Sequence, residues 1–164
     1  MAKEVAHNPE TENPIEAVTT ALKKAGVTLH PLDKNPDQPE NVEILGANIN
    51  GFIYNFWFID KALMVARVQV QTDRPTDSPD PSYYLQCVPF NSGPFGVSVS
   101  IVDSDATPAT QAFQIEHEFF LGTPWFDSQL MAVVGQVFNA ASTIATQLGE
   151  HCTFPKDWVN PAQN

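Results

Sequence analysis

The stretch Gln111-Ala-Phe-Gln-Ile-Glu-His-Glu-Phe119 alternates strictly between two kinds of side chain. One face of an extended chain here would carry Phe113, Ile115, His117 and Phe119, and the other would carry Gln114, Glu116 and Glu118. A period of two with one polar face is typical of a half-buried antiparallel strand. The sequence therefore predicts a strand over 111–119 that buries one face.

A long amphipathic helix is predicted soon after this strand. Apolar residues recur there at helical spacing and form one wide stripe. The stripe consists of Leu130, Val133, Val134, Val137, Phe138, Ala141, Ile144, Ala145 and Leu148. We expect this last helix to end at Cys152. A strand and a helix that each bury one face can pack against each other, which predicts a two-layer α+β domain.

The rest of the chain predicts two more helices and four more strands. Asn13-Pro14-Ile15-Glu16 is typical of a capped helix start, and Gly26 is a natural stop. A short helix is expected over 83–91, broken near Pro89. The turn-rich segment 72–82 is expected to be a loop. With strands over 42–48, 52–59, 63–71 and 97–102, the prediction is an antiparallel five-stranded sheet in the order α-β-β-β-α-β-β-α.

Composition is typical of a single globular domain. The chain has 164 residues, 43% of them hydrophobic, and a formal net charge of -11. We expect a flexible N-terminal segment over 1–12, one domain over 13–155 and a tail over 156–164. The acidic charge argues against binding nucleic acid or an anionic membrane surface through charge. No secretory signal and no bilayer-spanning apolar run is visible, so the expected location is the cytoplasm.

No reaction centre is visible in the sequence, and we expect no catalytic, cofactor-binding or metal-binding residues. The four histidines lie in different segments without the paired spacing of a metal site: His7, His30, His117 and His151. Cys87 and Cys152 are too few for a disulfide framework, so we expect free thiols that are buried or half-buried. The predicted function must therefore be a binding function, or chemistry that the sequence does not show.

The strand expected over 52–59 is apolar on both faces. One face would carry Phe52, Tyr54, Phe56 and Phe58, and the other Ile53, Asn55, Trp57 and Ile59. Two explanations stay open for the second face. Either acidic loops cover it, or it is part of a partner-binding patch, because large exposed apolar surfaces mark interaction sites. We take Ile53, Asn55, Trp57 and Ile59 as the candidate partner-binding residues.

The end of the chain carries the most recognisable pattern. It contains Phe113-Gln-Ile-Glu-His-Glu, a Leu121-Gly122 bend, Asp127-Ser128-Gln129-Leu130 and a long helix closing on Phe154-Pro155. From about residue 14 to 155 the chain resembles the bacterial YbjN-domain family, whose members share the fold of type III secretion chaperones. It departs from that pattern at Thr123-Pro124-Trp125-Phe126 and at Pro89. The resemblance implies a non-enzymatic binding or chaperone-like regulator that is a homodimer, with no catalytic residues to carry over.

The expected function is a non-enzymatic cytoplasmic protein-binding module, chaperone-like or regulatory. Its partner would be a protein client or a second copy, and its acidic surface favours basic or amphipathic segments. A first alternative is a small-ligand carrier or an enzyme with an aromatic pocket between the sheet and the long helix. That pocket would be lined by Phe52, Tyr54, Phe113 and Phe138. A second alternative is a structural homodimer subunit of a larger assembly.

Overall fold

The computed structural model describes residues 3–93 and 96–153, which form three helices and one sheet. The helices are α1 (Pro14–Lys24), α2 (Ser82–Ser92) and α3 (Asp127–Leu148), and a 3-10 turn, η1 (Gly149–His151), follows α3. The strands are β1 (His30–Pro31), β2 (Val42–Ile49), β3 (Phe52–Ile59), β4 (Leu63–Pro75), β5 (Ser98–Asp103), β6 (Thr110–Phe120) and β7 (Cys152–Thr153). The predicted α+β class is confirmed.

The sheet is antiparallel and has seven strands, not the five predicted. Its order is β1-β2-β3-β4-β6-β5, and β7 pairs with β4 outside this path. The five long strands lie where the alternating pattern predicted them, within a few residues. The two additional strands, β1 and β7, are only two residues long. A two-residue strand is too short to show an alternation of apolar and polar residues, so the sequence pattern did not reveal either one.

Two predicted boundaries near β7 were wrong. Strand β4 does not end at Gln71 but continues to Pro75. Thr72 pairs with Cys152 of β7, and past a register shift Pro75 pairs with Thr110 of β6. The last helix ends at Leu148, not at Cys152. Gly149 follows with a φ of 55°, a backbone conformation that glycine adopts without a steric penalty. The chain then turns through η1 and enters the sheet.

The predicted break of the middle helix was also wrong, because α2 runs through Pro89 to Ser92. Proline has no N–H, so its presence removes the hydrogen bond to the carbonyl of Leu85. Leu85 and Pro89 both lie on the exposed side of α2. Water can therefore satisfy the carbonyl that proline leaves unpaired, and the helix continues.

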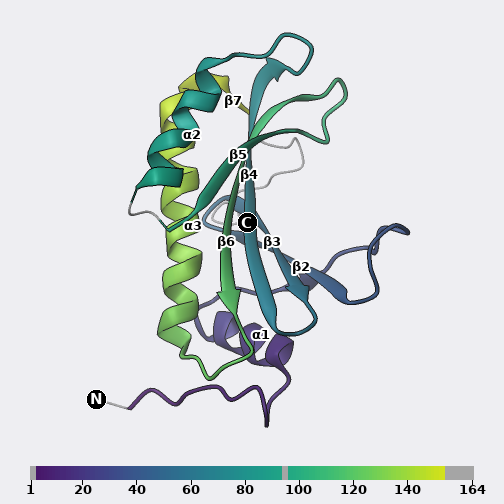
Figure 1. Cartoon of the computed structure of the whole chain (residues 1–164), viewed down its shortest axis with the longest axis vertical. Coiled ribbons are helices and arrows are strands. Elements are labelled where there is room, and N and C mark those ends of the chain that lie inside the picture. The colour runs from purple at the N-terminus through teal and green to yellow at the C-terminus, as the bar shows by residue number, and fades with distance from the viewer. Residues whose placement is uncertain (1–2, 94–95, 154–164) are drawn as a thin grey trace.

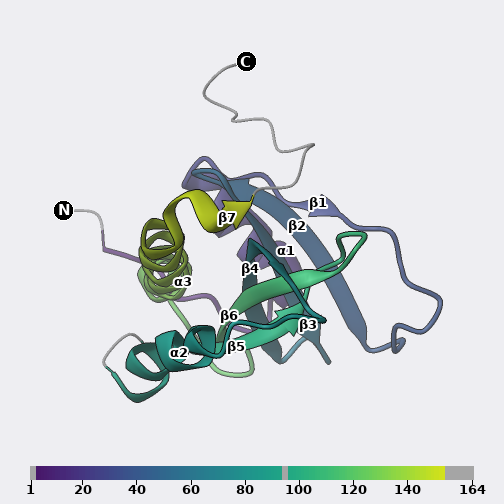
Figure 2. The same ribbon diagram turned by 90° about the horizontal axis from the view of Figure 1, so that it is seen from above.

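All three helices bury apolar side chains in one core, on one face of the sheet. Helix α3 lies along β4 and β6, α2 lies beside the C-terminal half of α3, and α1 lies near its N-terminal end (Figures 1 and 2). The hydroxyl of Tyr54 on β3 donates a hydrogen bond to the carbonyl of Val134 on α3 at 3.1 Å. His117 is half-buried on this inner face, where it pairs with Ala66, as the alternation predicted.

Residues 3–12, expected to be a flexible segment, contact the start of α3. The backbone N–H of His7 donates to the carbonyl of Trp125 at 2.7 Å, and the N–H of Trp125 donates back at 3.1 Å. The carboxylate of Glu4 accepts hydrogen bonds from the backbone N–H and the hydroxyl of Ser128 at 2.7 and 2.9 Å. An acidic group at this position satisfies a free N–H and interacts well with the helix dipole. The expected tail over 156–164 lies outside the described residues.

Candidate functional site

The four candidate residues of β3 lie on the face of the sheet opposite the helices, here called the outer sheet face. Side chains of a strand point alternately to the two faces of the sheet. Tyr54, Phe56 and Phe58, which lie between the candidate residues in β3, are buried in the helix-facing core, so the candidate residues point the other way. Ile53 is 45% exposed, while Asn55, Trp57 and Ile59 are half-buried. The most accessible apolar group of this set is therefore Ile53.

An ion pair covers Trp57 on the outer sheet face. The guanidinium carbon of Arg67 lies 4.4 Å from the centre of the Trp57 ring. Arg67 also donates to the carboxylate of Glu116, with its Nη2 atom 2.5 Å from Oε1. Asn55, Arg67 and Glu116 occupy one row across β3, β4 and β6, so the sheet register aligns these groups. The indole Nε1 of Trp57 is shielded from solvent and has no hydrogen-bond partner among the described residues.

Leu32 covers another part of the outer sheet face. Gly46 of β2 lies opposite Asn55, and a Cβ atom placed on Gly46 would be only 3.0 Å from the Leu32 Cδ2 atom. Glycine thus leaves the space in which the Leu32 side chain packs on the sheet. The outer sheet face is covered by Leu32 at β2, shielded by Arg67 at Trp57 and open at Ile53.

The four aromatic residues considered for a ligand pocket are packed in the core region. Tyr54 and Phe113 are fully buried. Phe52 and Phe138 contact each other edge to face, with their ring centres 5.7 Å apart. Four surface cavities of the described chain are lined by other residues. This arrangement favours a packing role for the four rings.

Helix α2 exposes a row of large apolar side chains that the sequence interpretation did not single out. Its buried side carries Tyr83, Cys87 and Phe90. Its exposed side, here called the α2 face, consists of Tyr84, Leu85 and Val88, which are 56%, 72% and 55% exposed. One sequence signal could have revealed it: the chain has no charged residue from Pro81 to Val102, although its net charge is -11.

Within the described part of the chain, neither the two thiols nor the potential metal-ligand side chains form a group that could hold a metal ion. Cys87 and Cys152 are both free, the first buried and the second half-buried, as predicted. Within residues 3–93 and 96–153, no three His, Cys, Asp or Glu side chains are grouped to hold a metal ion. In the same ranges no helix has the length and apolar character needed to cross a bilayer.

Comparison with known proteins adds no further assignment, because no protein-family model and no curated protein matches this chain. The resemblance to the YbjN-domain family stays a prediction. Two residues of the pattern Asp127-Ser128-Gln129-Leu130, on which the resemblance rests, have structural roles in core packing and helix capping. Leu130 is fully buried, and the side-chain oxygen of Gln129 accepts a hydrogen bond from the Phe126 N–H at 2.9 Å.

Proposed function

We propose that this protein is a non-enzymatic, cytoplasmic protein-binding module, chaperone-like or regulatory, that binds its partner through the α2 face. The observation that supports this proposal is the exposure of three neighbouring apolar side chains on one helix. Val88 is adjacent to both Leu85 and Tyr84 on the helix surface, because it follows them by three and four residues. A contiguous exposed apolar patch is typical of a surface that another protein covers.

The size of the apolar groups makes the α2 face a good anchor. Complete burial of a leucine or valine side chain contributes about 1.5–3 kcal/mol relative to leaving it in water. Tyrosine adds a large, stiff contact area with a polar end and is enriched at interfaces. Since α2 carries no charged residue, a partner would not have to remove a charge from water in order to cover this helix.

The same surface suits either a protein client or a second copy of the chain. Two copies with a net charge of -11 each repel one another over most of their surfaces. A neutral helix face reduces this repulsion where contact is made. The resemblance to the YbjN-domain family also implies a homodimer, so self-association through α2 is one form of the proposed function.

The test replaces Leu85 by glutamate, which places a charge in the centre of the α2 face. The matched control is Thr20→Glu, which adds the same charge at an exposed position of α1. Mass from light scattering reports a second copy, and affinity capture from native cytoplasm reports a client. We expect the Leu85 variant to lose dimer or client while it keeps the wild-type circular dichroism spectrum. Unchanged mass and unchanged capture in the Leu85 variant would contradict the proposal.

A further inference from the structure

Two cavities lie between α2 and the end of α3. One cavity of about 530 Å³ lies at the start of α2, beside β4 and η1. A second cavity, also about 530 Å³, lies further along α2. Gln86 of α2 and Gln147 of α3 line both cavities. Because the two cavities share one residue from each helix, they adjoin, and together they are here called the groove.

The first half of the groove, here called the acidic half, carries all of its charged side chains. Asp73, Arg74, Asp80 and His151 line it. The His151 Nδ1 atom lies 3.0 Å from the Asp73 carboxylate, and Arg74 donates from its side chain to the carbonyl of Ser78. Hydrogen bonds from the Ser82 side chain and backbone hold the pKa of Asp80 below its usual range. With neutral His151, the two carboxylates outnumber the one guanidinium.

The second half of the groove, here called the apolar half, is lined by Leu85, Pro89, Phe90 and Thr143 besides the two glutamines. None of these side chains is charged, and Leu85 also belongs to the α2 face. The side-chain oxygen of Gln86, between the two halves, is shielded from solvent and lacks a hydrogen-bond partner in the described part of the chain.

We propose that this groove binds a segment of a partner protein that carries an apolar side chain next to a lysine or arginine. The apolar side chain enters the half lined by Leu85, Pro89 and Phe90. The cationic side chain enters the half that contains Asp73 and Asp80. This inference rests on the proposed protein-binding function and names the chemistry of the partner. The net charge of -11 supports it, since it attracts basic segments toward the surface.

Protonation of His151 would weaken this binding. The charged or titratable groups that line the acidic half are Asp73 and Arg74 from β4, Asp80 before α2, Tyr83 from α2 and His151 from η1, and the charge of Glu150 also acts on His151. A protonated His151 places a positive charge beside Asp73 and competes there with the cation of the ligand. We therefore expect the partner segment to bind more weakly at pH 5.5 than at pH 7.5, and the His151→Gln variant to lose this difference.

The test uses fluorescein-labelled, end-blocked peptides in which one leucine and one arginine are separated by alanine spacers of different length. Comparison peptides replace arginine by citrulline, which keeps the shape without the charge, or leucine by serine. Fluorescence anisotropy measures affinity, and amide chemical shifts locate the bound peptide. We expect the peptide with both groups to shift the signals of Gln86, Gln147 and His151. Removing either group should weaken binding roughly tenfold, the factor that corresponds to 1.4 kcal/mol.

Two charge variants decide whether the groove itself recognises the arginine. Asp73→Asn with Asp80→Asn removes two charges from the acidic half and keeps an oxygen that can accept from Ser82. Asp33→Asn with Asp37→Asn removes two charges from an exposed loop and is the matched control. The first pair should abolish the preference for arginine over citrulline, and the control pair should keep it.

The outcomes separate this inference from the proposed function. Equal loss of preference in both charge variants would show attraction by the overall charge, and would overturn the inference. Absence of peptide binding, or shifts confined to the outer sheet face or to a dimer contact across the groove, would also overturn it. In those cases the effect of Leu85→Glu on native capture still decides the proposed function separately.

Discussion

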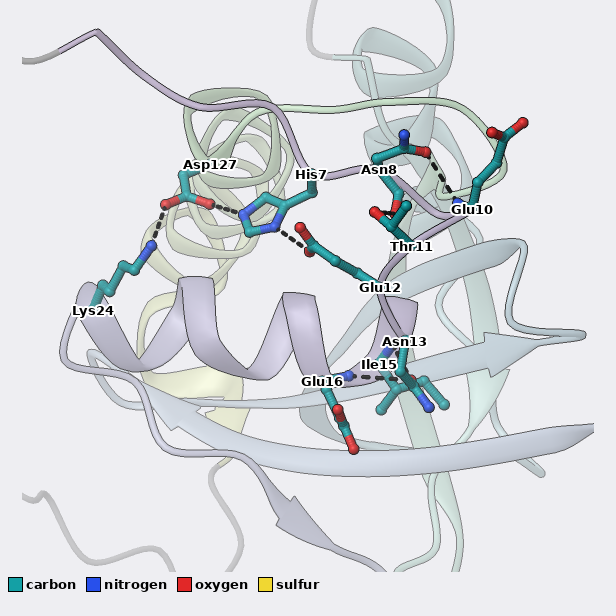
Figure 3. A network of polar contacts seen from close by, with 10 residues as sticks. All are labelled: His7, Asn8, Glu10, Thr11, Glu12, Asn13, Ile15, Glu16, Lys24 and Asp127. Carbon is teal, nitrogen blue, oxygen red and sulfur yellow. Dashed lines mark hydrogen bonds and ion pairs between the residues drawn. The ribbon is translucent and has the colours of Figure 1, made fainter.

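The ring Nε2 atom of His7 lies 2.6 Å from a carboxylate oxygen of Asp127, although 120 residues separate them in the chain (Figure 3). The Nδ1 atom of the same ring lies 2.8 Å from Glu12, and Asp127 also accepts from the Lys24 ammonium at 3.4 Å. The imidazole stacks on Trp125 with ring centres 4.2 Å apart. This cluster, here called the N-terminal clasp, joins the N-terminal segment, the end of α1 and the start of α3.

Replacement of His7 by phenylalanine should destabilise the fold. The change removes both ion pairs and keeps the stacking on Trp125. A hydrogen bond to a charged group contributes about 1.5–3 kcal/mol when shielded, and an exposed ion pair about 0.2–1 kcal/mol. The half-buried clasp lies between these cases, so we expect a loss of about 1–2 kcal/mol in the free energy of unfolding, measured with urea. His30→Phe, at an exposed position, is the control and should change it by less than about 0.5 kcal/mol.

The clasp should stabilise the protein most in mildly acidic solution. Burial lowers the pKa of His7, but the hydrogen bonds and charges of Glu12 and Asp127 outweigh it, so the pKa lies above the usual 6.5. This contribution is complete below pH 6.5 and is lost as the pH rises through the raised pKa. Burial raises the pKa of Asp127, but the hydrogen bonds and charges of His7 and Lys24 lower it by a larger amount, so the pKa lies below the usual 3.8. That contribution is present above pH 3.8 and is lost as the pH falls through the lowered pKa.

The difference in unfolding free energy between wild type and His7→Phe should therefore be largest between about pH 4 and 6.5. Urea unfolding of both proteins across the pH range measures this difference directly. Subtraction of the variant cancels other titrating groups, such as His151. A difference that does not vary with pH would mean that the ion pairs of the His7 ring with Glu12 and Asp127 do not contribute to stability.

Local pattern was sufficient to predict the long elements of this fold. The alternation over 111–119 and the stripe from Leu130 to Leu148 both correspond to elements that bury the predicted side. Asn13 caps α1 as predicted, since its side-chain oxygen accepts from the backbone N–H of Ile15 at 3.0 Å. These features depend on neighbours in sequence. The clasp and the pairing of Thr72 with Cys152 depend on residues far apart in the chain, so no local pattern predicted them.

The candidate binding surface was harder to predict, because exposure depends on how an element packs. The sequence placed Trp57 on the outer sheet face but could not show that Arg67 lies over its ring. It also predicted a helix around Tyr84 without showing which side faces the core. Helix α2 is apolar on both sides, so its sequence has no polar stripe that would mark the exposed side. The absence of charge was the remaining signal.

Replacement of Arg67 by alanine should expose Trp57 and weaken the sheet. The guanidinium contacts both the indole ring and the Glu116 carboxylate, and it is half-buried. Loss of a cation–π contact costs about 0.5–2 kcal/mol, and loss of the ion pair adds about 0.2–1 kcal/mol. We expect a fall of about 1–2 kcal/mol in unfolding free energy and a red shift of the tryptophan emission that is missing when Trp57 is also replaced by phenylalanine.

A double-mutant cycle tests whether the ion pair with Glu116 contributes to this effect. If the guanidinium acts on both groups, Arg67→Ala and Glu116→Gln together should cost less than the sum of the single changes. Arg67→Lys should recover only part of the loss, because an ammonium cannot stack on the ring and bind the carboxylate with two N–H groups at once. Additive single effects would assign the stability change to the Trp57 contact alone.

The two thiols should react with iodoacetamide in a fixed order, Cys152 before Cys87. Burial raises the pKa of both thiols, so little of the reactive thiolate is present in the folded protein at neutral pH. Cys152 lies in the two-residue strand β7, whose pairing with β4 can open locally without loss of the core. Cys87 lies on the buried side of α2 and donates a hydrogen bond to the carbonyl of Tyr83, so it becomes accessible only when α2 leaves the sheet. Mass spectrometry of the single variants Cys87→Ser and Cys152→Ser measures each rate, and urea-unfolded protein supplies the reference rate. Faster labelling of Cys87 would show that α2 detaches more readily than β7 and would remove the rigid helix on which the α2 face depends.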